Sequence, residues 1–265
     1  MRKTLYDLWD NMFRIVALNI GFLLILGIPI FLPALISKVM IFFGLRPPGL
    51  EMVLTGVGIL ISAVYLSTAS YTLRNISDYG TFGFADFFGN IKHAWKAGLV
   101  MGLAAFILFL VPTLIMPFYL EFNNIIGLLL AATLFWVTLF GMVSFQFYFA
   151  VYTRLGGKIG KSLKKCMILS LDNTGYAFFL FIHNLIVIYL SVRFSFMMFL
   201  LIVPGPAGML LYIDQALRLR LFKYDWLEAN PGANRKKIPW EELLVEERER
   251  VGHRTFKNFI FPWKD

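Results

Sequence analysis

Long apolar runs, separated by short polar segments, dominate the sequence. Each run is close to the ~20 residues that cross the hydrocarbon layer of a bilayer as a helix. Each is also almost free of ionisable side chains, as a segment without solvating water must be. The pattern therefore predicts an all-α integral membrane protein with six transmembrane helices. The expected spans are residues 15–35, 53–73, 97–116, 125–151, 174–190 and 194–213.

A shorter amphipathic segment precedes the first, third and fifth spans. Its apolar residues recur three and four positions apart, the spacing of one helix face, and the segments begin near residues 4, 82 and 158. We interpret the chain as three tandem units, about 4–80, 81–157 and 158–220, each an amphipathic interfacial helix followed by a transmembrane hairpin. The alternative is that any six-span protein with alternating loops shows some periodicity. Whether the units pack with pseudo-threefold symmetry stays open.

The distribution of basic residues predicts the orientation of the spans. With the N-terminus inside, 14 lysines and arginines near the membrane lie on the cytoplasmic side and three on the opposite side. Lysine and arginine are enriched in cytoplasmic loops. We therefore expect a multi-pass protein of the bacterial cytoplasmic (inner) membrane with both termini in the cytoplasm. The first apolar run is too long for a cleaved signal and is interpreted as an uncleaved span.

The composition changes after the six-span domain, residues 1–220, and predicts a cytoplasmic tail, residues 221–265. Pro239 precedes a charged segment, 240–250, and proline is favoured at the first position of a helix. The chain then becomes strongly aromatic. These aromatic side chains need a surface that buries them, and the sequence leaves two open: the protein's own membrane face, or a partner. The side chains concerned are Trp240, Phe259, Phe261 and Trp263.

Composition supports the membrane assignment and excludes several other classes. Of the 265 residues, 58% are hydrophobic and only 15% charged, whereas a soluble domain has about a quarter charged. This argues against a soluble enzyme, a disordered protein and a nucleic-acid module, although the net charge is +9. The single cysteine, Cys166, excludes an internal disulfide and a cysteine-based zinc site.

Five residues within the spans could line a polar or substrate path. His183, next to Asn184, could relay protons or contact a polar substrate, or it could be neutral and bonded to a neighbouring helix. Asn19 could line the same path or hold two helices together by hydrogen bonds. Pro204 and Pro206 could interrupt the sixth span, and interrupted helices form binding sites in transporters.

A basic segment between the fourth and fifth spans has two possible roles. Its lysines could contact anionic lipid headgroups or a phosphate-rich partner. Alternatively, they mark a cytoplasmic loop and do no more than set the orientation. They are Lys158, Lys161, Lys164 and Lys165.

No motif for catalysis or for a cofactor is found. The sequence contains no G-x-x-x-x-G-K-[ST] phosphate loop, no H-E-x-x-H metal motif and no G-x-S-x-G nucleophile turn. Three histidines and one cysteine offer no evident metal set. We therefore predict a protein that is not an enzyme, with no catalytic residues, no metal and no cofactor.

Several short runs of sequence, in the order in which they occur, make this chain resemble the bacterial YesL-type membrane proteins. The runs are LNIGF (18–22), GIPI (27–30), LPA (32–34), TASYTLR (68–74) and FADFFGNIK (84–92). The layout is similar over roughly residues 5–215, whereas the tail after 225 departs from the family's shorter ending. That family has no established activity, and its members often accompany binding-protein-dependent sugar uptake systems. The resemblance thus implies an accessory role in carbohydrate transport.

Three functions follow as hypotheses. The first is a non-enzymatic accessory or assembly partner of a membrane complex, such as a carbohydrate ABC uptake system. The second is a small-molecule transporter or channel in its own right. The third is a scaffold whose basic interfacial helices bind anionic lipid. A homo-oligomer stays open in all three.

Overall fold

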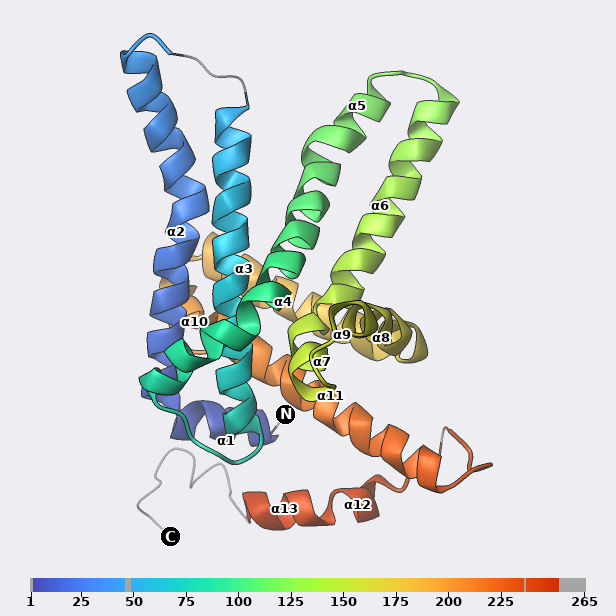
Figure 1. Cartoon of the computed structure of the whole chain (residues 1–265). Coiled ribbons are helices and arrows are strands. Elements are labelled where there is room, and N and C mark those ends of the chain that lie inside the picture. The colour runs from blue at the N-terminus through green and yellow to red at the C-terminus, as the bar shows by residue number, and fades with distance from the viewer. Residues whose placement is uncertain (1, 46–48, 236, 253–265) are drawn as a thin grey trace.

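The computed structural model describes residues 2–45, 49–235 and 237–252, and this part of the chain is helical (Figure 1). Two short stretches depart from α-helix: a π-helix, η1, at Val111–Ile115 and a 3-10 helix, η2, at Ser195–Met197. The α-helices are α1 Arg2–Asp10, α2 Met12–Phe42, α3 Leu50–Ser77, α4 Phe84–Leu110, α5 Met116–Leu120, α6 Ile125–Phe145, α7 Tyr148–Arg154, α8 Ile159–Asp172, α9 Thr174–Arg193, α10 Phe199–Ile202, α11 Gly205–Ala229, α12 Trp240–Leu243 and α13 Val245–Val251.

Five helical runs in the described part are long and apolar enough to cross a membrane. They contain the first five predicted spans, which confirms an all-helical chain with several helices long and apolar enough to span a membrane. Some runs join successive elements, because α4 continues through η1 into α5 and α6 is followed closely by α7. The five runs are Met12–Phe42, Leu50–Ser77, Phe84–Leu120, Ile125–Arg154 and Thr174–Arg193.

The sixth predicted span is broken in the structure. Ser195–Ile202 and Gly205–Ala229 meet at an angle of 55°, so residues 194–213 do not form the continuous helix expected from their hydropathy. The physical cause lies in the sequence at the break. Pro206 has no backbone N–H to donate, and Gly205 has a φ of +42°, a backbone conformation that glycine adopts readily.

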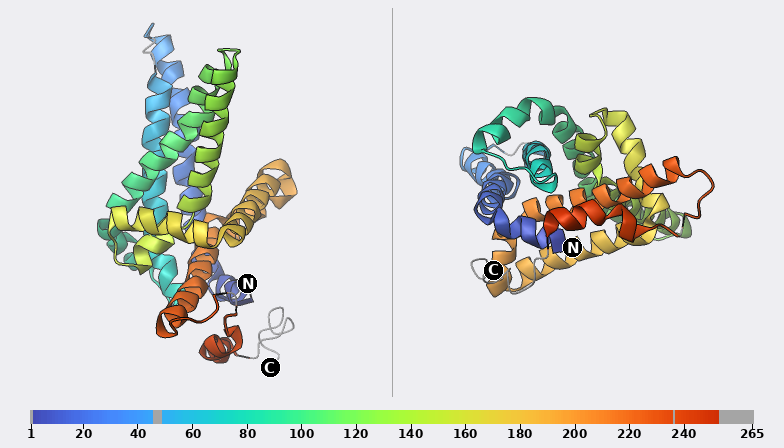
Figure 2. Two further views of the ribbon diagram at one scale, coloured as in Figure 1. Left: turned by 90° about the vertical axis from the view of Figure 1, so that its right-hand side faces the viewer. Right: turned by 90° about the horizontal axis from the view of Figure 1, so that it is seen from below.

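Two hairpins stand upright, and a third pair of helices runs across their lower ends (Figure 1). The upright pairs are α2 with α3, and α4 and α5 with α6. Both views in Figure 2 show α9 and α11 in a different direction from the upright helices. The middle of α11 packs against α2, α3 and α7, where its side chains are buried. The domain boundary expected at residue 220 therefore falls inside one continuous helix.

The amphipathic segments differ in how they join the spans. As predicted, α1 and α8 are separate helices, and each is followed by an asparagine with non-helical dihedral angles, Asn11 and Asn173. The second segment is instead the first part of α4. The helix has no break between Trp95 and Ala97, so α4 continues from the amphipathic segment into the third span.

Close contact between the upright helices depends on small residues. A Cβ atom at Gly98 of α4 would lie 2.4 Å from Cα of Val64 on α3, and one at Gly58 of α3 would lie 2.5 Å from Pro29 on α2. Two clusters of buried apolar side chains form the core. One surrounds the fully buried Tyr148 of α7, and the other surrounds Ile15 and Leu73 of α2 and α3.

Candidate functional site

Asn19 holds the broken helix. Its side chain, 0% exposed on α2, reaches the segment between α10 and α11. The amide nitrogen lies 2.9 Å from the carbonyl oxygen of Ile202 and 3.2 Å from those of Val203 and Pro204, and the amide oxygen accepts from Ala207 N at 2.8 Å. Asn19 thus bonds the carbonyl oxygens of Ile202 and Val203 and the N–H of Ala207 at the break, whereas the carbonyl oxygen of Pro204 also accepts from Gly208 N at 2.6 Å. We call this arrangement the Asn19 clamp.

The clamp explains why glycine occupies the break. A Cβ atom at Gly205 would lie 2.4 Å from Cγ of Asn19, which is closer than real contacts allow. The α2 backbone is held from the other side as well, since Tyr65 of α3 donates to the carbonyl oxygen of Leu18 at 2.8 Å. The three helices α2, α3 and α11 are therefore tied together at this level.

The structure brings Asn19 and Pro204 together but places the histidine elsewhere. His183 lies on α9 with its ring centroid 5.1 Å from that of Tyr212, about two helical turns along α11 from the break. Its Nδ1 atom is 3.4 Å from Oδ1 of Asn184, a long contact. The five predicted path residues therefore form two groups, one at the clamp and one on α9.

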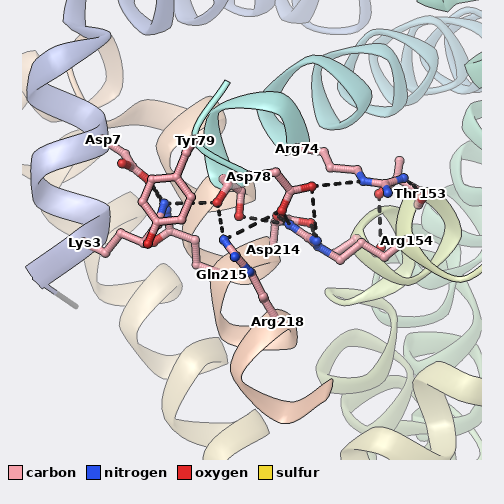
Figure 3. A network of polar contacts seen from close by, with 12 residues as sticks. Lys3, Asp7, Arg74, Asp78, Tyr79, Thr153, Arg154, Asp214, Gln215 and Arg218 are labelled. Carbon is pink, nitrogen blue, oxygen red and sulfur yellow. Dashed lines mark hydrogen bonds and ion pairs between the residues drawn. The ribbon is translucent and has the colours of Figure 1, made fainter. Parts of the chain in front are cut away.

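A charged network joins α3, α7 and α11 (Figure 3). The guanidinium of Arg154 donates to both carboxylate oxygens of Asp214, at 2.7 and 2.5 Å, and the side chains are only 9% and 2% exposed. Arg154 also donates to Asp78 and to Ser77 Oγ, both at 3.0 Å. A fork of two parallel bonds is the strongest geometry for this pair of groups. The network therefore locks the end of α7 to the middle of α11.

The same network reaches the tail. Arg218 of α11 donates to Glu247 of α13 at 2.5 Å and to the carbonyl oxygen of Ser77 at 2.6 Å. The second carboxylate oxygen of Glu247 accepts from the hydroxyl of Tyr79 at 2.7 Å. Burial is the largest cause that raises the pKa of Tyr79, and the hydrogen bond to the Glu247 carboxylate raises it further. The hydroxyl therefore stays protonated and donates. Glu247 is thus the point at which the tail is fastened.

Helix α1 completes the network on its other side. Lys3 forms an ion pair with Asp7 at 2.5 Å and donates to the carbonyl oxygen of Ser77 at 3.0 Å. Gln215 of α11 donates to Asp7 and accepts from Thr4 at 2.5 Å. Burial raises the pKa of Asp7, and the contacts with Lys3 and Gln215 oppose that rise. The first amphipathic segment is therefore bonded to α11 and to the end of α3.

The lysines predicted to contact lipid or a partner are exposed in the structure. Lys158 precedes α8, the other three lie on its outer face, and the opposite face buries Cys166 and Leu169. Burial raises the pKa of the Cys166 thiol to about 12. Trp240 begins α12 and is half-buried. Phe259, Phe261 and Trp263 lie outside the described residues.

The sequence did not reveal the network as a site. Asp214 resembles an ordinary carboxylate at a span end, where water solvates it, yet the structure buries it. The signal that could have found it is charge pairing, because Arg154 and Asp214 both lie at the ends of predicted spans on the same side. Among the described residues, no group of three or more histidine, cysteine, aspartate or glutamate side chains could hold a metal ion.

Comparison with protein-family models, with curated proteins and with solved structures finds no match to this chain. The resemblance to the YesL-type family therefore stays a prediction that rests on the five short runs of sequence.

Proposed function

We propose that this chain is a non-enzymatic accessory or assembly partner of another membrane complex, and that the partner docks on its tail. The observation that carries the proposal is the fastening of α13. Glu247 bonds both Tyr79 and Arg218, so α13 is held against the turn that follows α3 and against the middle of α11. A tail held at a defined place can present its terminal aromatic residues to a partner.

Polar residues inside the spans support this proposal, because they bond helices to each other. The side chain of Asn19 forms the hydrogen bonds of the Asn19 clamp, between α2 and the break before α11. Gln146, which ends α6, donates to the carbonyl oxygen of Ala177 on α9, and Ser67 on α3 donates to that of Ala94 on α4, each at 2.9 Å. Interhelical bonds of this kind stabilise membrane bundles.

The resemblance to the YesL-type family suggests the class of partner. We propose a carbohydrate ABC uptake system in the bacterial cytoplasmic membrane, with both termini of this chain in the cytoplasm. The basic residues near the ends of the spans support that orientation. A reporter enzyme active only in the periplasm, fused after residue 265, should stay inactive. Activity of the fusion would reverse the orientation.

The test is purification from native membranes in a mild detergent, followed by mass spectrometry of the associated proteins. The full-length chain is compared with a form that lacks residues 253–265 and with the triple variant Phe259→Ser, Phe261→Ser, Trp263→Ser. Recovery of a membrane complex in fixed ratio with the full-length chain, and its loss from both altered forms, would support the proposal. Recovery of this chain alone, or only as a homo-oligomer, would contradict it.

A small-molecule transporter is the second candidate, and the broken helix favours it. Interrupted helices form substrate sites in several transporter folds, and the ends of α10 and α11 meet at the Asn19 clamp. Uptake into proteoliposomes would be measured for the protein and for Pro206→Ala and His183→Ala. Uptake that neither substitution changes would remove these residues from the transport path.

A further inference from the structure

A pocket of about 930 Å³ lies between α1, α9, α11 and α13, next to the charged network. Pockets that enclose most of a small organic ligand have about this volume. Helix α11 forms one wall over the stretch from Tyr212 to Phe222, and α13 closes the opposite side with Glu247 and Val251. No residue of this pocket was predicted as a site from the sequence.

The walls divide into an aromatic part and a cationic part. Helix α9 contributes Tyr176 and Phe179 to the pocket. Lys3, Arg218 and Arg248 supply three positive charges, and Glu247 is the one carboxylate among the residues that line it. The lining residues therefore carry a formal charge of +2, which is partly offset by Asp7, 2.5 Å from Lys3, and Asp78, 3.7 Å from Arg218. An apolar body with an anionic group is the ligand chemistry that fits such walls.

The Glu247 carboxylate already binds the Arg218 guanidinium, where an anionic ligand would bind. The carboxylate accepts from Arg218 at 2.5 Å, and the Arg218 side chain is 16% exposed. Helix α13 has seven residues and leaves Glu246 and Glu249 exposed, whereas Glu247 bonds Arg218 and Tyr79, and Arg250 lies over the Tyr79 ring at 5.7 Å. A second anion with better geometry could replace this carboxylate on the guanidinium.

We infer that this pocket binds a phosphate monoester that carries an apolar group. A monoester has a charge of about −1.5 to −2 near neutral pH, opposite in sign to the charge of the lining, and three oxygens that accept hydrogen bonds. Arg218 and Lys3 pair with the phosphate, and Tyr212 and Phe179 pack on the apolar group. Binding displaces the Glu247 carboxylate from Arg218, while the rest of α13 stays as a wall of the pocket. The ligand comes either from the bilayer, as a phosphatidic acid, or from solution, as an alkyl or aryl phosphate.

The binding test uses the full-length protein in nanodiscs of phosphatidylcholine. Decyl phosphate is titrated by calorimetry as the soluble probe, with inorganic phosphate as the control for the apolar group. In a second arm, native mass spectrometry compares retention of phosphatidic acid with retention of phosphatidylglycerol, a diester. Saturable binding in either arm supports the pocket and identifies the source of the ligand. No saturable binding in both arms overturns the inference.

Two substitutions separate a ligand pocket from ordinary packing. Glu247→Gln removes the competing charge, so affinity should rise on the order of fivefold, while Glu246→Gln on the same helix should leave it unchanged. Lys3→Gln should lower affinity by a similar factor and does not disturb the Arg154–Asp214 pair. Unchanged affinity in Glu247→Gln and Lys3→Gln would place the ligand elsewhere, such as on the exposed lysines of α8, and would refute the assignment.

Discussion

Replacing Asn19 by leucine should destabilise the bundle more than any comparable change of a polar residue in the spans. Leucine has nearly the same size and shape, so the substitution leaves no large cavity. It removes the groups that bond the carbonyl oxygens between α10 and α11 and the N–H of Ala207. The perturbation therefore isolates the hydrogen bonds of the clamp.

The magnitude follows from counting those bonds. An asparagine amide has two N–H groups to donate, so the three nearby carbonyl oxygens share two bonds, and Ala207 N supplies a third. At the ~0.6 kcal/mol average for an interhelical bond in a membrane, the loss would be about 2 kcal/mol. Among the released groups, the N–H of the buried Ala207 is left without a partner, which costs about 1–3 kcal/mol more. We expect a loss of about 4 kcal/mol in the free energy of unfolding.

The assay is reversible unfolding in mixed micelles with increasing sodium dodecyl sulfate. Asn184→Leu is the matched control, because that asparagine lies on α9, is half-buried, and contacts His183 only at 3.4 Å. Its loss should stay below about 1 kcal/mol. Equal stability of Asn19→Leu and the unmodified protein would refute the clamp. Equal losses in both variants would show that the bonds at the break have no special weight.

Three further predictions concern other features of the structure. Gly205→Ala should lower the free energy of unfolding by about 1–3 kcal/mol, because its φ is +42° and the new Cβ meets the clamp; Gly175→Ala, with open space around it, should not. Asp214→Asn breaks a buried ion pair and should cost about 3–5 kcal/mol, whereas the exposed Asp225→Asn on the same helix should cost little; equal losses would remove the pair as a stabilising feature. Cys166 is buried and burial raises its pKa to about 12, so the thiol stays protonated at pH 8 and should react with a maleimide only after unfolding. Rapid labelling of the folded protein would contradict the burial.

The spans were predictable because their signal is local. A run of apolar residues long enough to cross a bilayer needs no knowledge of its neighbours, and the first five runs are helices in the structure. The break in the sixth was visible in part, since Pro204 and Pro206 stand at its centre. The residue that holds the break was not assigned to it, because Asn19 is more than 180 positions away along the chain.

The network and the pocket depend on pairs that are distant in sequence. Arg154 and Asp214 are 60 residues apart, and Arg154 and Asp78 are 76 apart. Each residue by itself is typical of a span end facing water. Only the crossing of α11 under the upright hairpins brings them together, and no periodicity in the sequence encodes that crossing. For the same reason the pocket, which four separate helices enclose, could not be predicted.

The continuity of α11 gives the molecule a lever arm. One end of this 25-residue helix rests on the break held by Asn19, and the other carries the chain towards α12 and α13. The charged network bonds α11 to α7 at Asp214, so a tilt of the helix would pivot there. At 1.5 Å of rise per residue the 15 residues beyond Asp214 extend about 22 Å, and a tilt of about 10° would move the far end by about 4 Å. The break lies closer to this pivot than the far end does, so a small displacement at the break would be larger where the chain leaves α11 for the tail.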